Sequence, residues 1–368
     1  MKRIAIIATW CGVVNRGAET FSIELAKKLR HHYKIKVFSV GIAPEIADIT
    51  TKVTMDMSWW SKVLKWGERS SSIFRKVCGH YPQFSFGEYQ QTVFVRKVCR
   101  EYLQKQDYDL VLACCGGIGA HELVKLRQLK GTPYVYVNHG GLGRSEFLAL
   151  LDKPDCYVTI SNLQRRWAEY HYSRVRRIPN GVDCARFAVR KNTIKKEKIV
   201  LDVAALTAFK RPKLLIDAMR YVPDAKLLLV GRGEMEAEVR EYGKAVLGDR
   251  FELKAVPYVE MPSIYQQASV FSLPSYDEPF GIVYLEAMAS GLPVVAPDDE
   301  IRQELVGKAG ITCNVTNGKA YATAIKRAFA TEWGDKPVKQ AKKYDWEMIA
   351  EQYRNLFEDV MSDYHESN

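Results

Sequence analysis

The sequence has no cysteine pair spaced as C-x-x-C, the usual element of zinc sites and of thiol redox sites. The eight cysteines are scattered instead: Cys11, Cys78, Cys99, Cys114, Cys115, Cys156, Cys184 and Cys313. This distribution argues against a disulfide framework and against a structural zinc site. It is typical of reduced thiols in a cytosolic protein.

Long apolar runs are also absent, since no stretch of about 18 apolar residues occurs. We therefore expect no membrane-spanning helix. Residues 1–8 (MKRIAIIA) are too short for a signal peptide and lack a small-residue cleavage site, so we expect a buried first strand there. The loop after this strand lacks G-x-G-x-x-G, and a dinucleotide site gains little support.

Positive charge is distributed unevenly along the 368 residues. The net charge is +11, but residues 1–190 hold 30 Lys and Arg against 16 Asp and Glu, which gives +14 there and −3 in the remainder. A basic half favours an anionic partner, such as nucleic acid, a membrane surface or a phosphorylated ligand. A basic surface that only confers solubility is the alternative.

Strand and helix patterns alternate along the chain, which predicts an α/β fold with parallel sheets. The alternation is interrupted by the charged segment 191–198 and then starts again, and the length suits two domains. We predict a Rossmann-like domain at 1–185, a linker at 186–197 and a second Rossmann-like domain at 198–345. Residues 346–368 should form a final helix, capped by Asp345, that packs back toward the first domain.

The stretch 277–295 (DEPFGIVYLEAMASGLPVV) combines a turn, a helix and a buried strand. Its proline and first glycine predict the turn, and a helix should start at Ile282. Free N–H groups at a helix N-terminus suit a phosphate. Glu278 precedes that position and Glu286 lies about two turns inside the helix. A carboxylate beside a phosphate site indicates a ligand that also carries hydroxyl groups.

Other candidate ligand-binding residues lie at the ends of predicted strands. Lys210 and Arg211 follow the first strand of the second half, where cations could bind a diphosphate. His139 ends the strand at 133–138, and such a side chain points into the ligand crevice of an open parallel sheet. Gly17 follows Arg16 in the loop after the first strand, where a glycine would let a diphosphate approach, although the turn alone also explains a glycine.

Two further patterns carry weaker hypotheses. Residues 57–80 interleave tryptophans with lysines and arginines at helical spacing, which suits either a membrane interface or a packed helix with a solvated basic face. Asp107 and Asp109 form a D-x-D sequence that could bind a metal, but an aspartate that opens a buried strand is far commoner.

The segment from Glu278 to Val295 resembles the E-x7-E signature of the retaining family-4 glycosyltransferases. Lys210, Ser161, the segment 178–183 (IPNGVD) and the final helix support the resemblance, which extends from Met1 to about Met361 and is weaker at 41–130. It implies the GT-B fold, in which two facing Rossmann-like domains enclose an interdomain cleft. The C-terminal domain of that fold holds the donor nucleotide, and the N-terminal domain binds the acceptor.

The resemblance also implies roles for individual residues. Glu286 would bind the ribose hydroxyls, Glu278 would contact the transferred sugar, and His139 would shield the developing oxocarbenium ion. The remaining donor-binding positions would be Gly17, Arg16, Lys210, Arg211, Phe280, Gly281, Ile282 and Val283 for the diphosphate, with Val256 and Tyr258 for the base. The family usually has an arginine where this chain has Ala205, and Arg211 is a candidate substitute.

The family needs neither a metal nor another cofactor, because basic residues and helix N-termini neutralise the diphosphate. The leaving phosphate can itself take the acceptor proton, which fits a motif without an obvious nucleophile–base pair. We therefore predict a metal-independent retaining hexosyltransferase that uses a UDP- or GDP-sugar. The alternatives are a nucleotide-sugar epimerase or a phosphorylase on the same scaffold, or a non-catalytic basic module that binds membrane or nucleic acid.

The basic, aromatic first half predicts an anionic or lipid-linked acceptor, such as a precursor of an envelope polysaccharide. We expect a cytoplasmic protein, peripheral at the inner face of the membrane, with no nucleic acid partner. The identity of the sugars does not follow from the sequence, because backbone atoms recognise much of the base.

Overall fold

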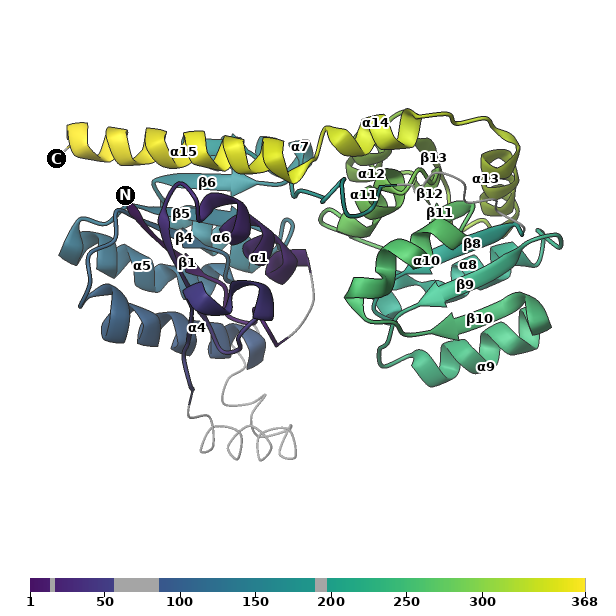
Figure 1. Cartoon of the computed structure of the whole chain (residues 1–368), viewed down its shortest axis with the longest axis horizontal. Coiled ribbons are helices and arrows are strands. Elements are labelled where there is room, and N and C mark those ends of the chain that lie inside the picture. Colours follow the sequence, from purple (N-terminus) through teal and green to yellow (C-terminus); the bar gives the residue numbers. More distant parts are fainter. Residues whose placement is uncertain (14–16, 56–85, 189–196, 368) are drawn as a thin grey trace. The chain divides into compact units, whose positions relative to one another are not determined.

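The structure, a computed structural model, describes residues 1–13, 17–55, 86–188 and 197–367. Arg16, the segment 57–80 and most of the predicted linker lie outside these described residues. The chain divides into two units (Figure 1). Unit 1 contains Met1–Thr159, Gln164–Arg177 and Gln352–Asn368, and unit 2 contains Ile160–Leu163 and Ile178–Glu351.

Unit 1 is built on a parallel sheet with the strand order β3-β2-β1-β4-β5-β6-β7. Its strands are β1 (Arg3–Ile7), β2 (Lys34–Ser39), β3 (Thr50–Lys52), β4 (Leu110–Ala113), β5 (Tyr134–Asn138), β6 (Cys156–Thr159) and β7 (Val175–Arg177). The central strand β1 pairs with β2 on one side and with β4 on the other. Because helices cover both faces of such a sheet, β4 (LVLA) is apolar and buried along its whole length, and β1 is buried from Ile4 onward.

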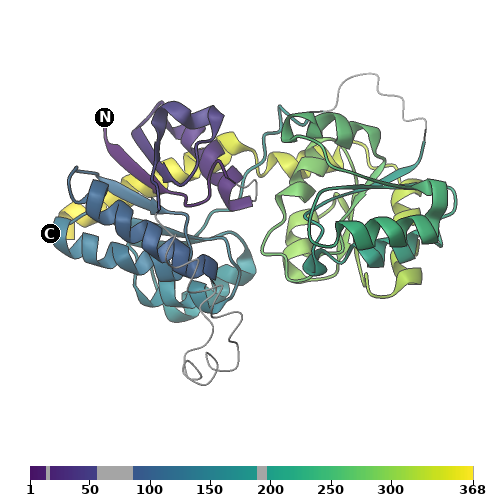
Figure 2. The same cartoon turned by 90° about the horizontal axis from the view of Figure 1, so that it is seen from below.

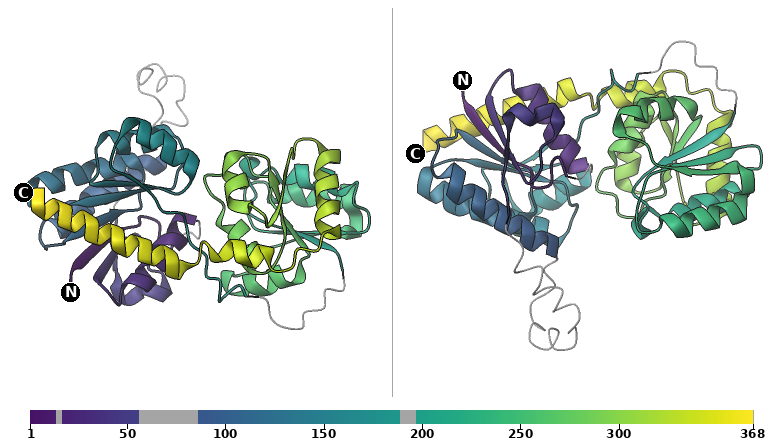
Figure 3. Two further views of the ribbon diagram at one scale, coloured as in Figure 1. Left: turned by 90° about the horizontal axis from the view of Figure 1, so that it is seen from above. Right: turned by 60° about the horizontal axis from the view of Figure 1, so that its bottom comes forward.

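The helices of unit 1 alternate with these strands along the chain and pack against the sheet, as Figures 2 and 3 show from three further directions. They are α1 (Gly17–Leu29), a 3₁₀ segment (Pro44–Ile49), α4 (Phe86–Val98) with a π-helical turn (Cys99–Leu103), α5 (Gly117–Lys130), α6 (Arg144–Leu151) and α7 (Asn162–His171). The second part of α15 (Trp346–Ser367) also packs on this unit, where Tyr33 donates a hydrogen bond to Glu358 at 2.7 Å.

Unit 2 contains a second parallel sheet, with the strand order β10-β9-β8-β11-β12-β13. Its strands are β8 (Ile199–Val203), β9 (Lys226–Val230), β10 (Phe251–Lys254), β11 (Val270–Ser272), β12 (Val294–Pro297) and β13 (Gly310–Cys313). Its α-helices are α8 (Pro212–Met219), α9 (Glu236–Leu247), α10 (Met261–Gln267), α11 (Ile282–Ala289), α12 (Glu300–Val306), α13 (Gly318–Ala330) and α14 (Lys336–Lys342). Short 3₁₀ segments lie at Ala208–Lys210, Gly248–Arg250 and Tyr258–Glu260.

The alternation of side chains along the strands creates two hydrophobic clusters in unit 2. Leu201 and Phe271 join the cluster on the α11 face, whereas Val200 and Val270 join the cluster under α8 and α13. The predicted fold class, with two Rossmann-like parallel sheets, is confirmed.

The final helix begins as the sequence predicted. The Asp345 carboxylate accepts a hydrogen bond from the Glu347 amide at 3.0 Å, which is the capping interaction expected of an aspartate at this position. One face of α15 is buried and apolar, and it starts with Trp346, Ile349 and Tyr353. Among the described helices, none combines the length with the apolar character that crossing a bilayer requires.

Gly181 in unit 2 allows the segment 178–183 to approach the start of α15 closely. A Cβ atom added to Gly181 would lie 2.5 Å from the Trp346 indole. We therefore expect Gly181→Ala to lower the free energy of unfolding by about 1–3 kcal/mol, the usual effect of overpacking a core. Gly318→Ala is the control, because a Cβ there would make only an ordinary contact at 3.8 Å. Thermal melts of both variants test this, and equal melting temperatures would contradict it.

Candidate functional site

Two neighbouring strands of unit 2 deliver the central residues of the candidate site. β8 and β11 are neighbours in the sheet, with Val200 opposite Val270. From this pair the chain builds the sheet in opposite directions, since β9 lies on the far side of β8 and β12 lies on the far side of β11. The loops after β8 and β11 therefore leave the sheet at a topological switch point, where open α/β sheets bind ligands. The first loop carries Lys210, and the second carries Glu278.

Lys210 and Glu278 form an ion pair. The Lys210 ammonium group donates to Oε2 of Glu278, and the Ser275 hydroxyl donates to the same oxygen at 3.1 Å. Both partners are largely shielded, since their side chains are 25% and 13% exposed. Water screens such a pair less than one on the open surface. Sequence analysis singled out both charged residues but not their contact, and it missed Ser275.

The N-terminus of α11 lies directly after Glu278 in the chain. Gly281 precedes the helix with a φ of 90°, and no side chain in the described part of the chain caps the helix start. A Cβ on Gly281 would lie 2.6 Å from the Tyr284 ring, so this position requires glycine. Phe280 is buried against Tyr344, while Ile282 and Val283 are half-buried. The Tyr284 amide donates to the Gly281 carbonyl at 3.1 Å, which leaves the N–H groups of Ile282 and Val283 as the donors of this helix start beside the Lys210–Glu278 pair.

Glu286 lies inside α11 and is almost fully buried. The Tyr258 hydroxyl donates to its Oε1 at 3.1 Å, and the Tyr265 hydroxyl donates to its Oε2 at 2.7 Å. Burial raises the pKa of Glu286, and the two hydrogen bonds partly oppose that shift. The carboxylate is thus fixed in one orientation. Sequence analysis identified Tyr258 as a backbone contact for a base, but it missed Tyr265 entirely.

The neighbourhood of Tyr258 connects the predicted base-binding segment to α11. Arg186 stacks on the Tyr258 ring at 4.1 Å and donates to the Tyr258 carbonyl at 2.9 Å. Val256, Tyr258, Ile282 and Val283 pack against the same hydrophobic cluster. The structure therefore gathers the predicted residues of the second half within one unit.

Arg211, predicted as a diphosphate-binding residue, binds backbone carbonyls of its own unit. Its guanidinium donates to the carbonyls of Pro274 and Ser275, at 2.7 and 3.3 Å, and it lies over the Tyr276 ring. These contacts attach Arg211 to the loop that carries Glu278. Its charge remains next to Lys210, the preceding residue in the chain.

His139 belongs to unit 1, where it follows β5. Its ring lies edge-on to Phe21, with 4.7 Å between the ring centroids, and its buried Nε2 has no hydrogen-bond partner among the described residues. Burial lowers the pKa of His139 to about 4, so the imidazole is neutral at physiological pH. The buried Asn138 side chain fixes the next turn, since it accepts from the amides of Gly140 and Gly141 and donates to the Gly141 carbonyl.

Gly17 is exposed at the first position of α1 in unit 1. Arg16, the residue before it, lies outside the described residues. The N–H groups at the start of α1 follow the central strand β1, which is the expected place for a ligand-binding loop.

The D-x-D sequence has structural partners in unit 1. Asp107 pairs with Lys130 at 2.7 Å, and Asp109 accepts from the Arg3 amide at 2.6 Å. Both carboxylates lie at the start of β4, whereas ligand crevices form at the carboxyl ends of parallel strands. Over the described ranges, no three His, Cys, Asp or Glu side chains gather in a group that could hold a metal ion.

Asp202 is a buried carboxyl group on β8 that sequence analysis did not identify. It is 3% exposed, and burial raises its pKa to about 8 in spite of the nearby positive charge of Lys210. Burial raises the pKa values of Tyr265, Tyr284 and Tyr321, and the charge that Asp202 carries once it is ionised adds to these shifts. Asp202 therefore retains its proton at neutral pH, beneath the site.

Two protein-family models match the chain. The model described as "Glycosyltransferase Family 4" matches residues 15–186, and the one described as "Glycosyl transferases group 1" matches residues 186–355.

Curated relatives are similar to parts of the chain. The phosphatidyl-myo-inositol mannosyltransferase of Mycolicibacterium smegmatis is 31% identical over 220 residues, which cover 55% of this chain and 57% of the relative. The D-inositol 3-phosphate glycosyltransferase of Corynebacterium aurimucosum is 32% identical over 186 residues, or 45% of this chain and 44% of the relative. The chain thus spans about half of the length of the curated relatives that it matches.

Solved structures are similar over nearly the whole chain. Sucrose-phosphate synthase from Thermosynechococcus elongatus has a TM-score of 0.78 at 20% identity and covers 99% of this chain and 100% of its own. Anabaena HepE in complex with UDP and glucose has a TM-score of 0.76 at 18% identity, with 98% and 100% covered. At these identities the similarity shows the fold alone, which is GT-B.

The protonated state of Asp202 gives the protein a defined dependence on pH. An unfolded chain releases this proton near the ordinary value of 3.8, whereas the folded chain keeps it up to a pKa of about 8. The stabilisation of the folded protein by the protonated Asp202 is therefore fully present below pH 4. It is lost as the pH rises toward 8, which lowers the free energy of unfolding by up to about 5 kcal/mol. Asp202→Asn removes the titration.

We expect the melting temperature of Asp202→Asn to rise relative to wild type as the pH increases from 5 to 9. Melts of both proteins at each pH measure this difference, and effects common to both proteins cancel. A difference that stays constant with pH would contradict the raised pKa.

Proposed function

Because the chain belongs to glycosyltransferase family 4, whose models match both of its halves, we propose that it is a retaining hexosyltransferase. It moves a hexosyl unit from a nucleoside-diphosphate sugar to a sugar or lipid-linked acceptor. The observation that carries this proposal is the gathering of Lys210, Glu278, the uncapped start of α11 and Glu286 within one unit.

The donor nucleotide binds along α11 in this proposal. The diphosphate takes the N–H donors from Phe280 to Val283, and Lys210 supplies a positive charge. The ribose hydroxyls bind the Glu286 carboxylate, which two tyrosine hydroxyls hold in place and which retains further lone pairs. Val256 and Tyr258 contact the base. Arg211 and Arg16 add positive charge near the diphosphate, and Gly17 lets the diphosphate approach the backbone.

Bond cleavage develops negative charge on the leaving diphosphate and positive charge on the sugar ring. Donors that are already oriented toward the phosphate lower this barrier without reorganisation. Glu278 contacts the hydroxyls of the transferred sugar. His139 is suited to lie near the positive ring, because its low pKa leaves it neutral and its Nε2 has no partner among the described residues.

No separate base is required in this mechanism. The leaving phosphate takes the proton of the acceptor hydroxyl as the new glycosidic bond forms on the same face, which retains the configuration. We propose that a metal is also unnecessary, since Lys210 and the α11 amides already supply positive potential at the diphosphate.

The proposed acceptor is anionic or lipid-linked. The net charge of +14 in residues 1–190 supports this, as does the similarity to mannosyltransferases named for phosphatidyl-myo-inositol. The proposed location is the cytoplasmic face of the membrane, where the protein binds peripherally. Synthesis of an envelope glycan is the corresponding role.

Thermal stabilisation by nucleotides tests the donor site. We expect UDP or GDP, and the corresponding UDP- or GDP-sugar, to raise the melting temperature, because a ligand that binds only the folded protein stabilises it. Glu286→Gln should weaken that binding about tenfold, since it replaces a charged acceptor by a neutral one. Glu332→Gln, an exposed position in the same unit, should change nothing. No stabilisation of the wild type by either nucleotide would overturn the proposal.

Sedimentation with lipid vesicles tests the acceptor and the location. We expect vesicles with about one-third anionic lipid to bind more protein than neutral vesicles, and binding should weaken at high salt because ions screen the attraction. Full turnover with a neutral, soluble acceptor in the absence of lipid would contradict this part of the proposal.

A further inference from the structure

The loop that carries Glu278, Leu273–Gly281, has a backbone conformation that needs external support. We call it the Glu278 loop. Asp277 adopts a φ of 49°, in the left-handed region that residues other than glycine rarely occupy. Strained residues of this kind persist only where the surrounding structure holds them in place. The carboxylate proposed to contact the donor sugar directly follows this strained residue.

The part of the loop before Asp277 is attached to other elements by its backbone. The Tyr284 hydroxyl donates to the Leu273 carbonyl at 2.7 Å. Arg211 donates to the carbonyls of Pro274 and Ser275. The Tyr276 amide donates to the Phe209 carbonyl at 2.7 Å, which connects this loop to the loop of Lys210. These contacts do not reach past the strained residue.

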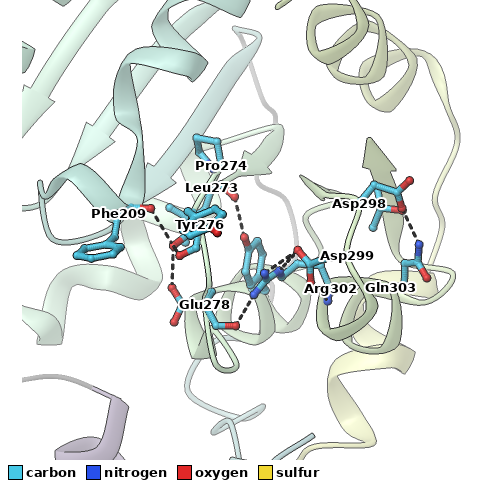
Figure 4. Close-up of polar contacts among 12 residues, drawn as sticks. Phe209, Leu273, Pro274, Tyr276, Glu278, Asp298, Asp299, Arg302 and Gln303 are labelled. Atoms are coloured by element: carbon cyan, nitrogen blue, oxygen red, sulfur yellow. Dashed lines mark hydrogen bonds and ion pairs between the residues drawn. The ribbon is translucent and has the colours of Figure 1, made fainter. Parts of the chain in front are cut away.

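Arg302 of α12 holds the loop after that point. Its Nη1 donates to the backbone carbonyl of Glu278, as Figure 4 shows. Arg302 is 3% exposed, and such a buried arginine must be neutralised. Its Nε and Nη2 bind Oδ2 of Asp299, at 2.7 and 2.6 Å, while Oδ1 of Asp299 caps α12 by accepting from the Arg302 amide. Asp299 therefore orients the guanidinium and leaves Nη1 directed at the Glu278 loop.

We propose that Arg302 is a positioning residue, which holds Glu278 at the orientation that donor turnover requires. The inference rests on the proposed function. Arg302 contacts the backbone of Glu278 and leaves the carboxylate to Lys210 and Ser275. It acts by preventing the backbone at Asp277 and Glu278 from relaxing to an unstrained conformation, which would turn the carboxylate away from the sugar.

A lysine cannot replace Arg302 in this role. The guanidinium binds Asp299 through two nitrogens and Glu278 through a third, in a fixed plane, whereas an ammonium group is a single point of charge. Arg302→Lys therefore keeps the buried charge and the pair with Asp299 but releases the Glu278 carbonyl.

Arg250→Lys is the matched control. Arg250 lies in the same unit, and its Nη1 also donates to backbone carbonyls, those of Met219, Val222 and Ala225. Its contacts lie away from the Glu278 loop. The control thus reports the general effect of replacing an arginine that binds the backbone.

Hydrogen–deuterium exchange tests the contact itself, independently of any activity. We expect peptides that cover residues 276–285 to exchange at least threefold faster in Arg302→Lys than in wild type, and at the wild-type rate in Arg250→Lys. Unchanged exchange in Arg302→Lys would overturn the inference.

A double-mutant cycle then tests whether Arg302 acts through Glu278. With the nucleotide sugar that gives the largest thermal shift, we expect Arg302→Lys to lower kcat at least tenfold while KM for the donor, and the affinity for the free nucleoside diphosphate, change less than threefold. Glu278→Gln should abolish most turnover, and adding Arg302→Lys to it should lower kcat less than threefold further. Independent losses that multiply, or a kcat of Arg302→Lys equal to wild type, would overturn the inference.

The two experiments separate this inference from the proposed function. A wild-type protein that neither binds nucleotides nor turns over a donor refutes the proposed function, and with it the role in turnover. Faster exchange in Arg302→Lys would in that case show only that Arg302 holds the loop.

Discussion

The ion pair between Lys210 and Glu278 is the interaction on which the rest of the candidate site depends. A carboxylate next to an uncapped helix N-terminus is attracted to the free N–H groups and would cap the helix itself. Lys210 and Ser275 hold Glu278 instead. The first turn of α11 remains uncapped by any side chain, and the same helix can then present Glu286 two turns further on. The separation of these groups makes one helix suitable for a ligand with both phosphates and hydroxyls.

Much of the fold was predictable from the sequence, because its signals are local. Apolar runs predicted the strands, and the observed starts of α11 and α15 agree with the predicted ones. Proline and glycine predicted the turn before α11. Glu278, Lys210 and His139 were identified because each lies at a strand end or beside a helix start, and these positions follow from the order of elements. Glu286 was identified from its spacing to Glu278 in the E-x7-E pattern.

The partners of these residues were not predictable in the same way. Arg302 lies 24 positions after Glu278, and nothing in the sequence around it indicates that its guanidinium binds that carbonyl. Tyr265 and Asp202 could not be identified either, because their neighbours in the fold are distant in the chain. Tyr265 donates to Glu286, and Asp202 is buried near Lys210. Arg211 is a residue that the sequence did identify, but its contacts could not be predicted. Its position suggested a phosphate ligand, but the same position also places its guanidinium against the carbonyls of Pro274 and Ser275.

If the donor binds as proposed, the ion pair of Lys210 with Glu278 also discriminates among the many anions of a cell. A small anion such as inorganic phosphate must separate Lys210 from Glu278, and it returns nothing to the carboxylate that it displaces. A ligand with hydroxyl groups at the correct distance from its phosphates gives both residues a new partner at the same time. In the proposed function, the Lys210–Glu278 contact thus favours a complete donor, which can replace that contact for both residues.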